Sequence, residues 1–115
     1  MPGRILSLSK KKDFDWVFKT GRSCFDKIIG VKVVPNELKQ QRLGIIISAK
    51  VSKKAVERNL LKRRLKVILK KELADISGDY DLVIIALPGA CAKNFAELNQ
   101  SVSWLFNRLK LKVKK

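Results

Sequence analysis

Two short apolar segments on either side of a long basic segment constrain the fold more than any other feature. They are RLGIIISAK at residues 42–50 and YDLVIIALP at residues 80–88. Short runs rich in isoleucine, valine and leucine are typical of buried strands, and the three consecutive isoleucines predict a central strand buried on both faces. Residues 53–75 have the length and apolar spacing of a helix, so a strand, a helix and a second strand follow one another.

A further helix is predicted near the start of the chain, at residues 9–20, SKKKDFDWVFKT. Phe14 and Phe18 share one of its faces, because they are separated by four residues. We expect Ser9 to cap the first turn and Gly21 to follow the last turn. The segment therefore has an apolar face and two defined ends.

Two other segments complete the expected secondary structure. Residues 22–35 are strand-like, with a β-branched VKVV sequence near their end. Residues 94–112 carry apolar side chains at helical spacing. The order is helix, β-rich segment, strand, helix, strand, helix. It predicts one α/β or α+β domain over residues 1–115, in which helices pack on a small sheet.

The chain is strongly basic, with 26 lysines and arginines against 10 aspartates and glutamates in 115 residues, a formal net charge of +16. Such an excess destabilises a small compact domain through repulsion. It is expected where the working state is bound to a polyanion. Nucleic acid is the first candidate, and an anionic membrane surface is the second.

Histidine is absent, which removes the commonest general base and the commonest metal ligand. Cys24 and Cys91, without histidine, cannot form a structural zinc site. We expect buried free thiols, although a disulfide between them is an open alternative. The N-terminal residues lack the apolar run of a signal peptide, and no segment has the length of a membrane span. We therefore expect a cytoplasmic protein.

The helix predicted at residues 53–75 has one cationic side. On a helical wheel, an arc of about 140° contains Arg58, Asn59, Lys62, Arg63, Lys66 and Lys70. The other side, expected to face a core, contains Val56, Leu60, Leu61, Val67 and Ile68. Solvated helix faces usually alternate the sign of their charges, whereas this one does not. Phosphate groups are the expected source of negative charge, and Asn59 can hydrogen-bond a base or a 2′-hydroxyl.

The same segment contains a specific pattern, Ser52-x-x-Ala55-x-x-Arg58-Asn59-Leu60-Leu61-Lys62-Arg63-x-Leu65-Lys66. It resembles the signature of the bacterial ribonuclease P protein component. Leu60 departs from the family by replacing a usual second arginine, and Lys66 stands where arginine is common. Further pieces extend the resemblance over nearly the whole chain: Asp13-Phe14-x-x-Val17-Phe18-x-x-Gly21, Arg42-Leu43-Gly44-Ile45, Asp79-Tyr80-Asp81 and Trp104-Leu105-Phe106.

The resemblance implies an α+β fold, a small α/β sandwich with a mixed sheet, whose topology is like that of some ribosomal proteins and includes a left-handed βαβ crossover. The crossover would consist of a strand at residues 43–49, a helix at 53–75 and a strand at 80–87. General statistics of βαβ units favour a right-handed connection. The left-handed expectation therefore comes from the family alone.

The resemblance also implies a function: removal of the 5′ leader from precursor tRNA by an endonuclease that contains RNA. The chemistry would belong to the catalytic RNA and its Mg²⁺ ions, and the protein alone would be inactive. The cationic side of the basic helix would contact the catalytic RNA. The leader would contact Phe14, Phe18 and Phe25 by stacking, with Lys50 near its phosphates. Plain core packing is the alternative for each phenylalanine.

Three other functions remain as alternatives. A ribosome-associated or nucleoid module that binds RNA or DNA without catalysis would share the charge and the fold class. A membrane-surface protein is disfavoured because the basic helix lacks anchoring tryptophan and phenylalanine. A nuclease made of protein alone is disfavoured because we expect Asp13, Asp15, Asp79 and Asp81 to act as caps and turn residues, and not as metal ligands.

Overall fold

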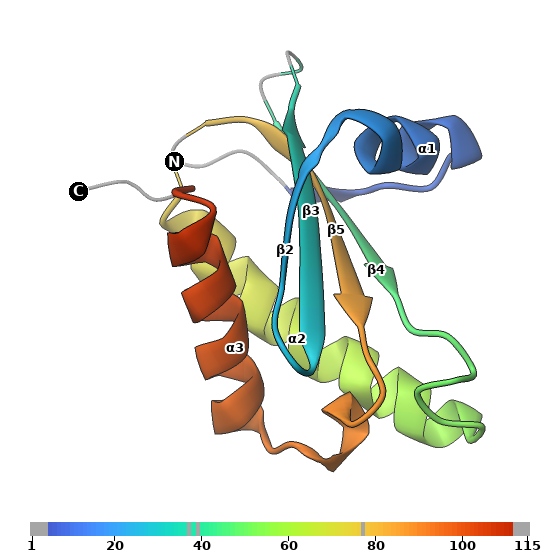
Figure 1. Ribbon diagram of the computed structural model, residues 1–115. Coiled ribbons are helices and arrows are strands. Elements are labelled where there is room, and N and C mark those ends of the chain that lie inside the picture. The colour runs from blue at the N-terminus through green and yellow to red at the C-terminus, as the bar shows by residue number, and fades with distance from the viewer. Residues whose placement is uncertain (1–4, 37, 39, 77, 112–115) are drawn as a thin grey trace.

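The computed structural model describes residues 5–36, 38, 40–76 and 78–111 (Figure 1). Three helices, one short 3₁₀ helix and five strands follow one another along these residues. In chain order they are β1 (Ile5–Ser7), α1 (Lys11–Thr20), β2 (Arg22–Phe25), β3 (Ile29–Pro35), β4 (Gln41–Ile46), α2 (Ala55–Ala74), β5 (Tyr80–Ala86), η1 (Ala90–Ala92) and α3 (Phe95–Arg108).

The strands form one mixed sheet in the order β1-β4-β5-β3-β2. β4 is parallel to β1 and β5, whereas β3 is antiparallel to its neighbours β5 and β2. In Figure 1, β4 and β5 both point downward with β4 to the right, and α2 passes behind the sheet between them. This connection is a left-handed crossover, as the resemblance implied, and the α+β fold class is confirmed.

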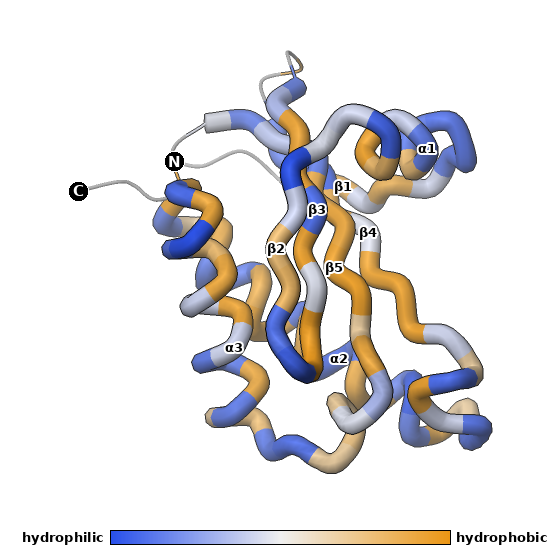
Figure 2. The backbone as a smooth tube through the Cα atoms, viewed as in Figure 1, coloured by the Kyte–Doolittle hydropathy of each residue, from blue (hydrophilic) through white to orange (hydrophobic). Residues whose placement is uncertain are grey.

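The helices cover the two faces of the sheet unequally. α2 and α3 pack on one face, where residues such as Leu65, Leu69, Ile84 and Leu105 form the larger core. α1 packs on part of the opposite face over a small cluster of Leu8, Val17, Val34 and Val83. Figure 2 shows hydrophobic residues along the central strands and hydrophilic residues at the outer turns of the helices. Part of the α1 side of the sheet is therefore left open.

The ends of α1 differ from the prediction. Its N-cap is Lys10, without a side-chain cap, so the assignment of Ser9 as the cap was wrong. Gly21 ends the helix as expected, but with φ −76°, so its backbone is not left-handed. Its N–H donates to the carbonyl of Val17. Sequence patterns give helix ends only to within one or two residues, because the last turn on each side lacks regular bonds.

The strand assignments also needed correction. The segment 22–35 contains two strands that pair as a hairpin, β2 and β3, and the short strand β1 was missed. β4 ends at Ile46, and it lies next to the edge strand. β5 is the central strand, buried along most of its length. The isoleucine run was therefore wrongly placed at the centre, because apolar content does not give the order of strands. The last predicted residue of the final helix, 112, lies outside the described residues.

The core-facing side of α2 is rotated relative to the prediction. Leu61 and Ile68 are buried as expected, but Val56 is 77% exposed, and Leu60 and Val67 are also exposed. The buried stripe consists of Leu61, Leu65, Ile68, Leu69 and Leu73. The helix carries more apolar residues than one face can bury, so the wheel alone allowed two orientations.

Asp81 is not a turn residue, as had been expected, but lies within β5 and is buried. Arg42 of β4 donates to both of its carboxylate oxygens, with Nε to Oδ1 2.8 Å and Nη2 to Oδ2 2.6 Å. Arg42 Nη1 also lies 3.3 Å from Oδ2 of Asp13 in the first turn of α1. This network fixes α1 to the sheet.

Candidate nucleic-acid interface

The open part of the sheet on the α1 side presents a row of residues from four neighbouring strands. Phe25 pairs with Gly30, Gly30 with Ile85, and Ile85 with Ile46. Ile46 and Ile85 pack against the small cluster beneath α1 while remaining partly exposed. The row therefore forms an apolar floor that water can reach.

Two aromatic rings and one lysine stand on this floor. Phe18 is 40% exposed and Phe25 is 45% exposed, so neither is a plain core residue. The ammonium nitrogen of Lys32, in β3, lies 5.7 Å from the centroid of each ring. This distance is within the range of cation–π attraction. The three side chains thus form one basic, aromatic unit, which we call the aromatic platform.

Two glycines let aromatic rings lie flat against the sheet. A Cβ atom at Gly30 would overlap the ring of Phe25, and one at Gly44 would lie 2.6 Å from Cε1 of Phe14. Phe14 is partly buried between α1 and β4, where it packs against the small cluster. Of the three predicted phenylalanines, Phe18 and Phe25 are therefore available for stacking, whereas Phe14 mainly packs.

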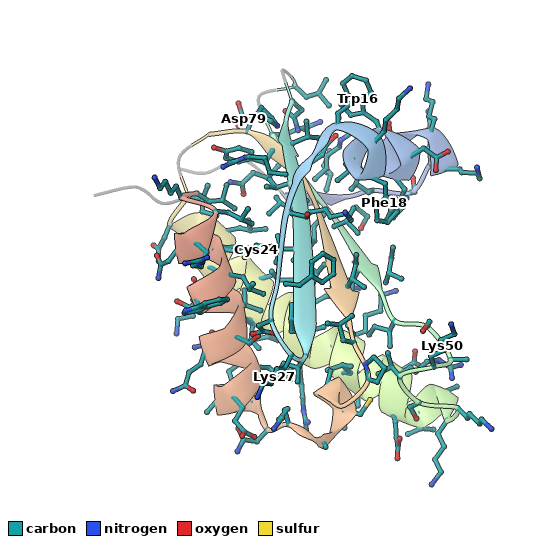
Figure 3. The ribbon with its side chains drawn as sticks, viewed as in Figure 1. Trp16, Phe18, Cys24, Lys27, Lys50 and Asp79 are labelled. Carbon is teal, nitrogen blue, oxygen red and sulfur yellow. The ribbon has the colours of Figure 1, made fainter. Side chains whose placement is uncertain are left out.

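Lys50 lies elsewhere. It is exposed in the loop that follows β4, and its backbone N–H donates to the hydroxyl of Ser48 at 3.2 Å. Figure 3 shows it at the end of the sheet remote from Phe18. Lys32 contacts the rings instead, and it was not selected from the sequence. The sequence feature that could have identified Lys32 is the alternation of side chains along the predicted strand, which places Lys32 on the same face as Gly30.

The cationic side of α2 is mostly exposed. Five of its predicted members reach solvent, and they are Asn59, Lys62, Arg63, Lys66 and Lys70. Arg58 is half-buried, because its Nη1 donates to the carbonyl of Ser52 at 2.7 Å. The hydroxyl of Ser52 in turn donates to Glu57 Oε1 at 2.6 Å. Arg58 therefore also holds the turn that leads into the helix.

Glu57 also lies near the half-buried thiol of Cys91, which is in η1. Burial raises the pKa of Cys91, the charge of Glu57 raises it further, and the charge of Arg64 lowers it. Cys24, on the α3 side of β2 in Figure 3, packs against the larger core. Both cysteines are free, as predicted, but they are half-buried, so the expectation that they would be buried was wrong.

The arrangement supports binding of two anionic segments at once. The aromatic platform lies on one face of the sheet, and α2 covers the opposite face. Among the described residues, no three side chains of the His, Cys, Asp or Glu types gather as a metal site. None of the helices in the described ranges is long and apolar enough to cross a membrane.

Comparisons with known proteins agree on one family. The family model of ribonuclease P matches residues 3–110. The ribonuclease P protein component of Alkaliphilus metalliredigens is 31% identical over 104 residues, which are 90% of this chain and 93% of the relative. The structure of the Staphylococcus aureus RNase P protein matches with a TM-score of 0.83 and 27% identity, covering 91% of this chain and 95% of that one. The structure of the RNase P protein from Thermotoga maritima matches with a TM-score of 0.78 and 27% identity, covering 89% of this chain and 96% of that one.

Proposed function

Because the chain belongs to the ribonuclease P protein family, we propose that it is the protein subunit of a cytoplasmic ribonuclease P. This enzyme removes the 5′ leader from precursor tRNA. Catalysis resides in the RNA subunit, and the protein alone is inactive. The observation that supports this function best is the presence of the aromatic platform on one face of the sheet and of the helix with the cationic side, α2, on the opposite face.

The RNA subunit docks against the exposed cations of α2. Lys62, Arg63 and Lys66 point to solvent without an acidic residue among them. Each phosphate that such a side chain neutralises releases condensed counterions, so binding is favourable and depends strongly on salt. Arg63 can hold a phosphate through two hydrogen bonds, and the lysines act as point charges.

The leader of the precursor binds on the aromatic platform. Base stacking on an aromatic ring contributes about 1–3 kcal/mol and tolerates any base, which suits leaders of different sequence. Phe18 and Phe25 supply the ring faces, and Lys32 supplies the charge that attracts the phosphates. Lys50 lies farther along the sheet, where it would meet a later phosphate of the same strand.

Mg²⁺ ions belong to the RNA subunit in this proposal. The described residues of the protein do not offer a group of carboxylates that fits such an ion. The protein acts through its positive charge, which offsets repulsion where the phosphates of the RNA subunit and of the precursor meet. A lower repulsion raises the affinity of the RNA both for its own ions and for the substrate.

The decisive experiment measures cleavage of a precursor tRNA by a bacterial ribonuclease P RNA at low millimolar Mg²⁺, with and without the protein. We expect strong activation, and no cleavage by the protein alone. The test variant is a charge-reversed protein, Lys62→Glu with Arg63→Glu, which should lose the activation while remaining folded. Tight RNA binding without activation would overturn the proposal in favour of a general RNA-binding module. Cleavage by RNA-free protein would overturn the assignment of the chemistry to RNA.

A further inference from the structure

A tryptophan and an arginine on α3 form a cation–π pair that belongs to neither of the surfaces described above. Trp104 is 50% exposed, and the guanidinium carbon of Arg108 lies 5.3 Å from the centroid of its ring. The two residues are one helical turn apart, and this distance is within the range of cation–π attraction. Half of the indole surface remains accessible to a ligand.

Two hydrogen bonds place this pair beside the edge strand β2. The hydroxyl of Ser101 donates to Asp26 at the end of β2, and Arg22 Nη1, at the start of β2, donates to the carbonyl of Leu109 at 3.0 Å. The helix and the strand therefore run side by side in opposite directions, as Figure 1 also shows. Trp104 follows Ser101 by three residues, which is about 4.5 Å along a helix.

The edge strand β2 and the step from one face of the sheet to the other separate this pair from the aromatic platform, because the platform lies on the α1 face and α3 packs on the opposite face. β2 is the last strand of the described sheet, and Phe25, at its end, belongs to the platform. Neighbouring strands are about 4.8 Å apart. Packed layers are about 10 Å apart, so a single strand of RNA that leaves Phe25 and passes around this edge would reach α3 within a few nucleotides.

The charges around this edge favour a polyanion. Arg22, Lys27 and Arg108 are exposed there, and Figure 3 shows Lys27 in the turn after β2. The carboxylate of Asp26 is occupied by the N–H groups of Ile28 and Ile29 and by the hydroxyl of Ser101. Glu97 forms a capping box with Asn94. These acids are engaged within the fold, whereas the cations stay exposed, although Arg22 also donates one hydrogen bond to the carbonyl of Leu109.

We propose that Trp104 and Arg108 form a second stacking site, which takes the part of the leader that extends past Phe25 around the edge of β2. The ligand is single-stranded RNA, with one base stacked on the indole and its phosphates near Arg22 and Arg108. The inference rests on the proposed function, because it names a longer substrate for the same protein. Precursors with long leaders thus bind better than those with short leaders.

The first test is a series of precursor tRNAs with leaders of increasing length, bound to the holoenzyme. In the wild type, affinity rises in a second step once the leader passes Phe25. Trp104→Ala removes this step, a loss of about tenfold for long leaders, and leaves short leaders unchanged. Trp16→Ala is the matched control, because Trp16 lies on α1 and is 54% exposed. It leaves both steps in place.

The series separates failure of this inference from failure of the proposed function. A wild type that binds short leaders better than mature tRNA, but shows no second step, overturns the inference alone. Equal losses in Trp104→Ala for short and long leaders also overturn it, because they indicate damage to the fold. Equal binding of leader-bearing and mature tRNA by the wild type overturns both.

A second test observes the indole directly. The chain has two tryptophans, so Trp16→Phe leaves Trp104 as the only one, and Trp104→Phe leaves Trp16. Single-stranded RNA oligonucleotides that are long enough to pass Phe25 should quench the fluorescence of the first variant and leave that of the second unchanged. Absence of quenching at saturating oligonucleotide would overturn the proposed stacking on Trp104.

Discussion

Arg42 and Asp81 form a two-pronged ion pair between neighbouring strands, with N–O distances of 2.8 and 2.6 Å. The carboxylate of Asp81 is 3% exposed. Its hydrogen bonds raise the pKa of Arg42 above the ordinary value, so the guanidinium stays charged throughout the working pH range. Through Asp13, the same arginine holds α1 over the sheet. The position of Phe18 on the aromatic platform therefore depends on this ion pair beneath α1.

Asp81→Asn should destabilise the protein by about 3 kcal/mol, because it leaves a partly buried guanidinium without its main partner. Urea denaturation followed by circular dichroism would measure the loss. The exposed pair of Lys11 and Asp15 provides the control, since Lys11→Ala should leave the free energy of unfolding almost unchanged. A loss from Asp81→Asn no larger than that of the control would refute the structural role of the pair.

The sequence predicted the number and type of the longer elements, but not how they face one another. Leu61, Leu65 and Ile68 already had the spacing of a buried stripe. Val56 and Val67 extended the apolar side, so the orientation of α2 was ambiguous until the sheet beneath it was known. Hydrophobic periodicity is decisive only when the apolar residues do not outnumber the positions that the neighbouring layer can cover.

The proposed docking of α2 on the RNA subunit predicts a graded loss of salt dependence. Lys62→Ala and Arg63→Ala should each weaken binding to the RNA subunit and lower the slope of log K against log salt by about 0.7–0.9 for each lost phosphate contact. Lys71→Ala is the matched control, because it removes the same charge from the opposite flank of the same helix. Filter binding over a range of salt concentrations measures all three. Identical slopes in the wild type and in both test variants would exclude this side of α2 as the docking surface.

Arg58→Ala has two expected effects, because this side chain also binds the backbone before α2. The loss of the hydrogen bond to the carbonyl of Ser52 should lower the free energy of unfolding by about 1 kcal/mol. Thermal unfolding of the free protein measures this part separately from RNA binding. An unchanged melting temperature together with weaker RNA binding would mean that Arg58 contacts RNA and contributes nothing to the turn.

The aromatic platform shows why only part of the candidate site could be predicted from the sequence. Phe18 and Phe25 were selected as aromatic residues, whereas Lys32 was hidden in a strand whose partner was not known. The hairpin register pairs Lys32 with Ser23 and Gly30 with Phe25, and only this register brings the ammonium group between the two rings. Contacts between residues distant in sequence cannot be derived from local patterns.

Gly30→Ala should weaken leader binding without removing any group that contacts RNA. The new methyl group would occupy the space of the Phe25 ring, which is exposed enough to swing away from the sheet. The affinity for leader-bearing precursor should fall by about tenfold, the equivalent of one lost stacking contact, while that for mature tRNA stays the same. Phe25→Ala is the reference, and the double variant should be no worse than either single one. Additive losses would show that Gly30 acts independently of Phe25.

The thiol of Cys91 should react slowly with alkylating reagents at neutral pH. Its pKa is raised first by burial and then by the charge of Glu57, and the reactive species is the thiolate. A raised pKa lowers the thiolate fraction at any pH below it, so the alkylation rate should rise only in the alkaline range.

Glu57→Gln keeps an acceptor for Ser52 but removes the negative charge, which should lower the pKa of Cys91 and shift the rate profile toward lower pH. Arg64→Ala should shift it the opposite way. Iodoacetamide labelling in a Cys24→Ser background isolates Cys91, and profiles that coincide in all three proteins would show that neither charge acts on this thiol.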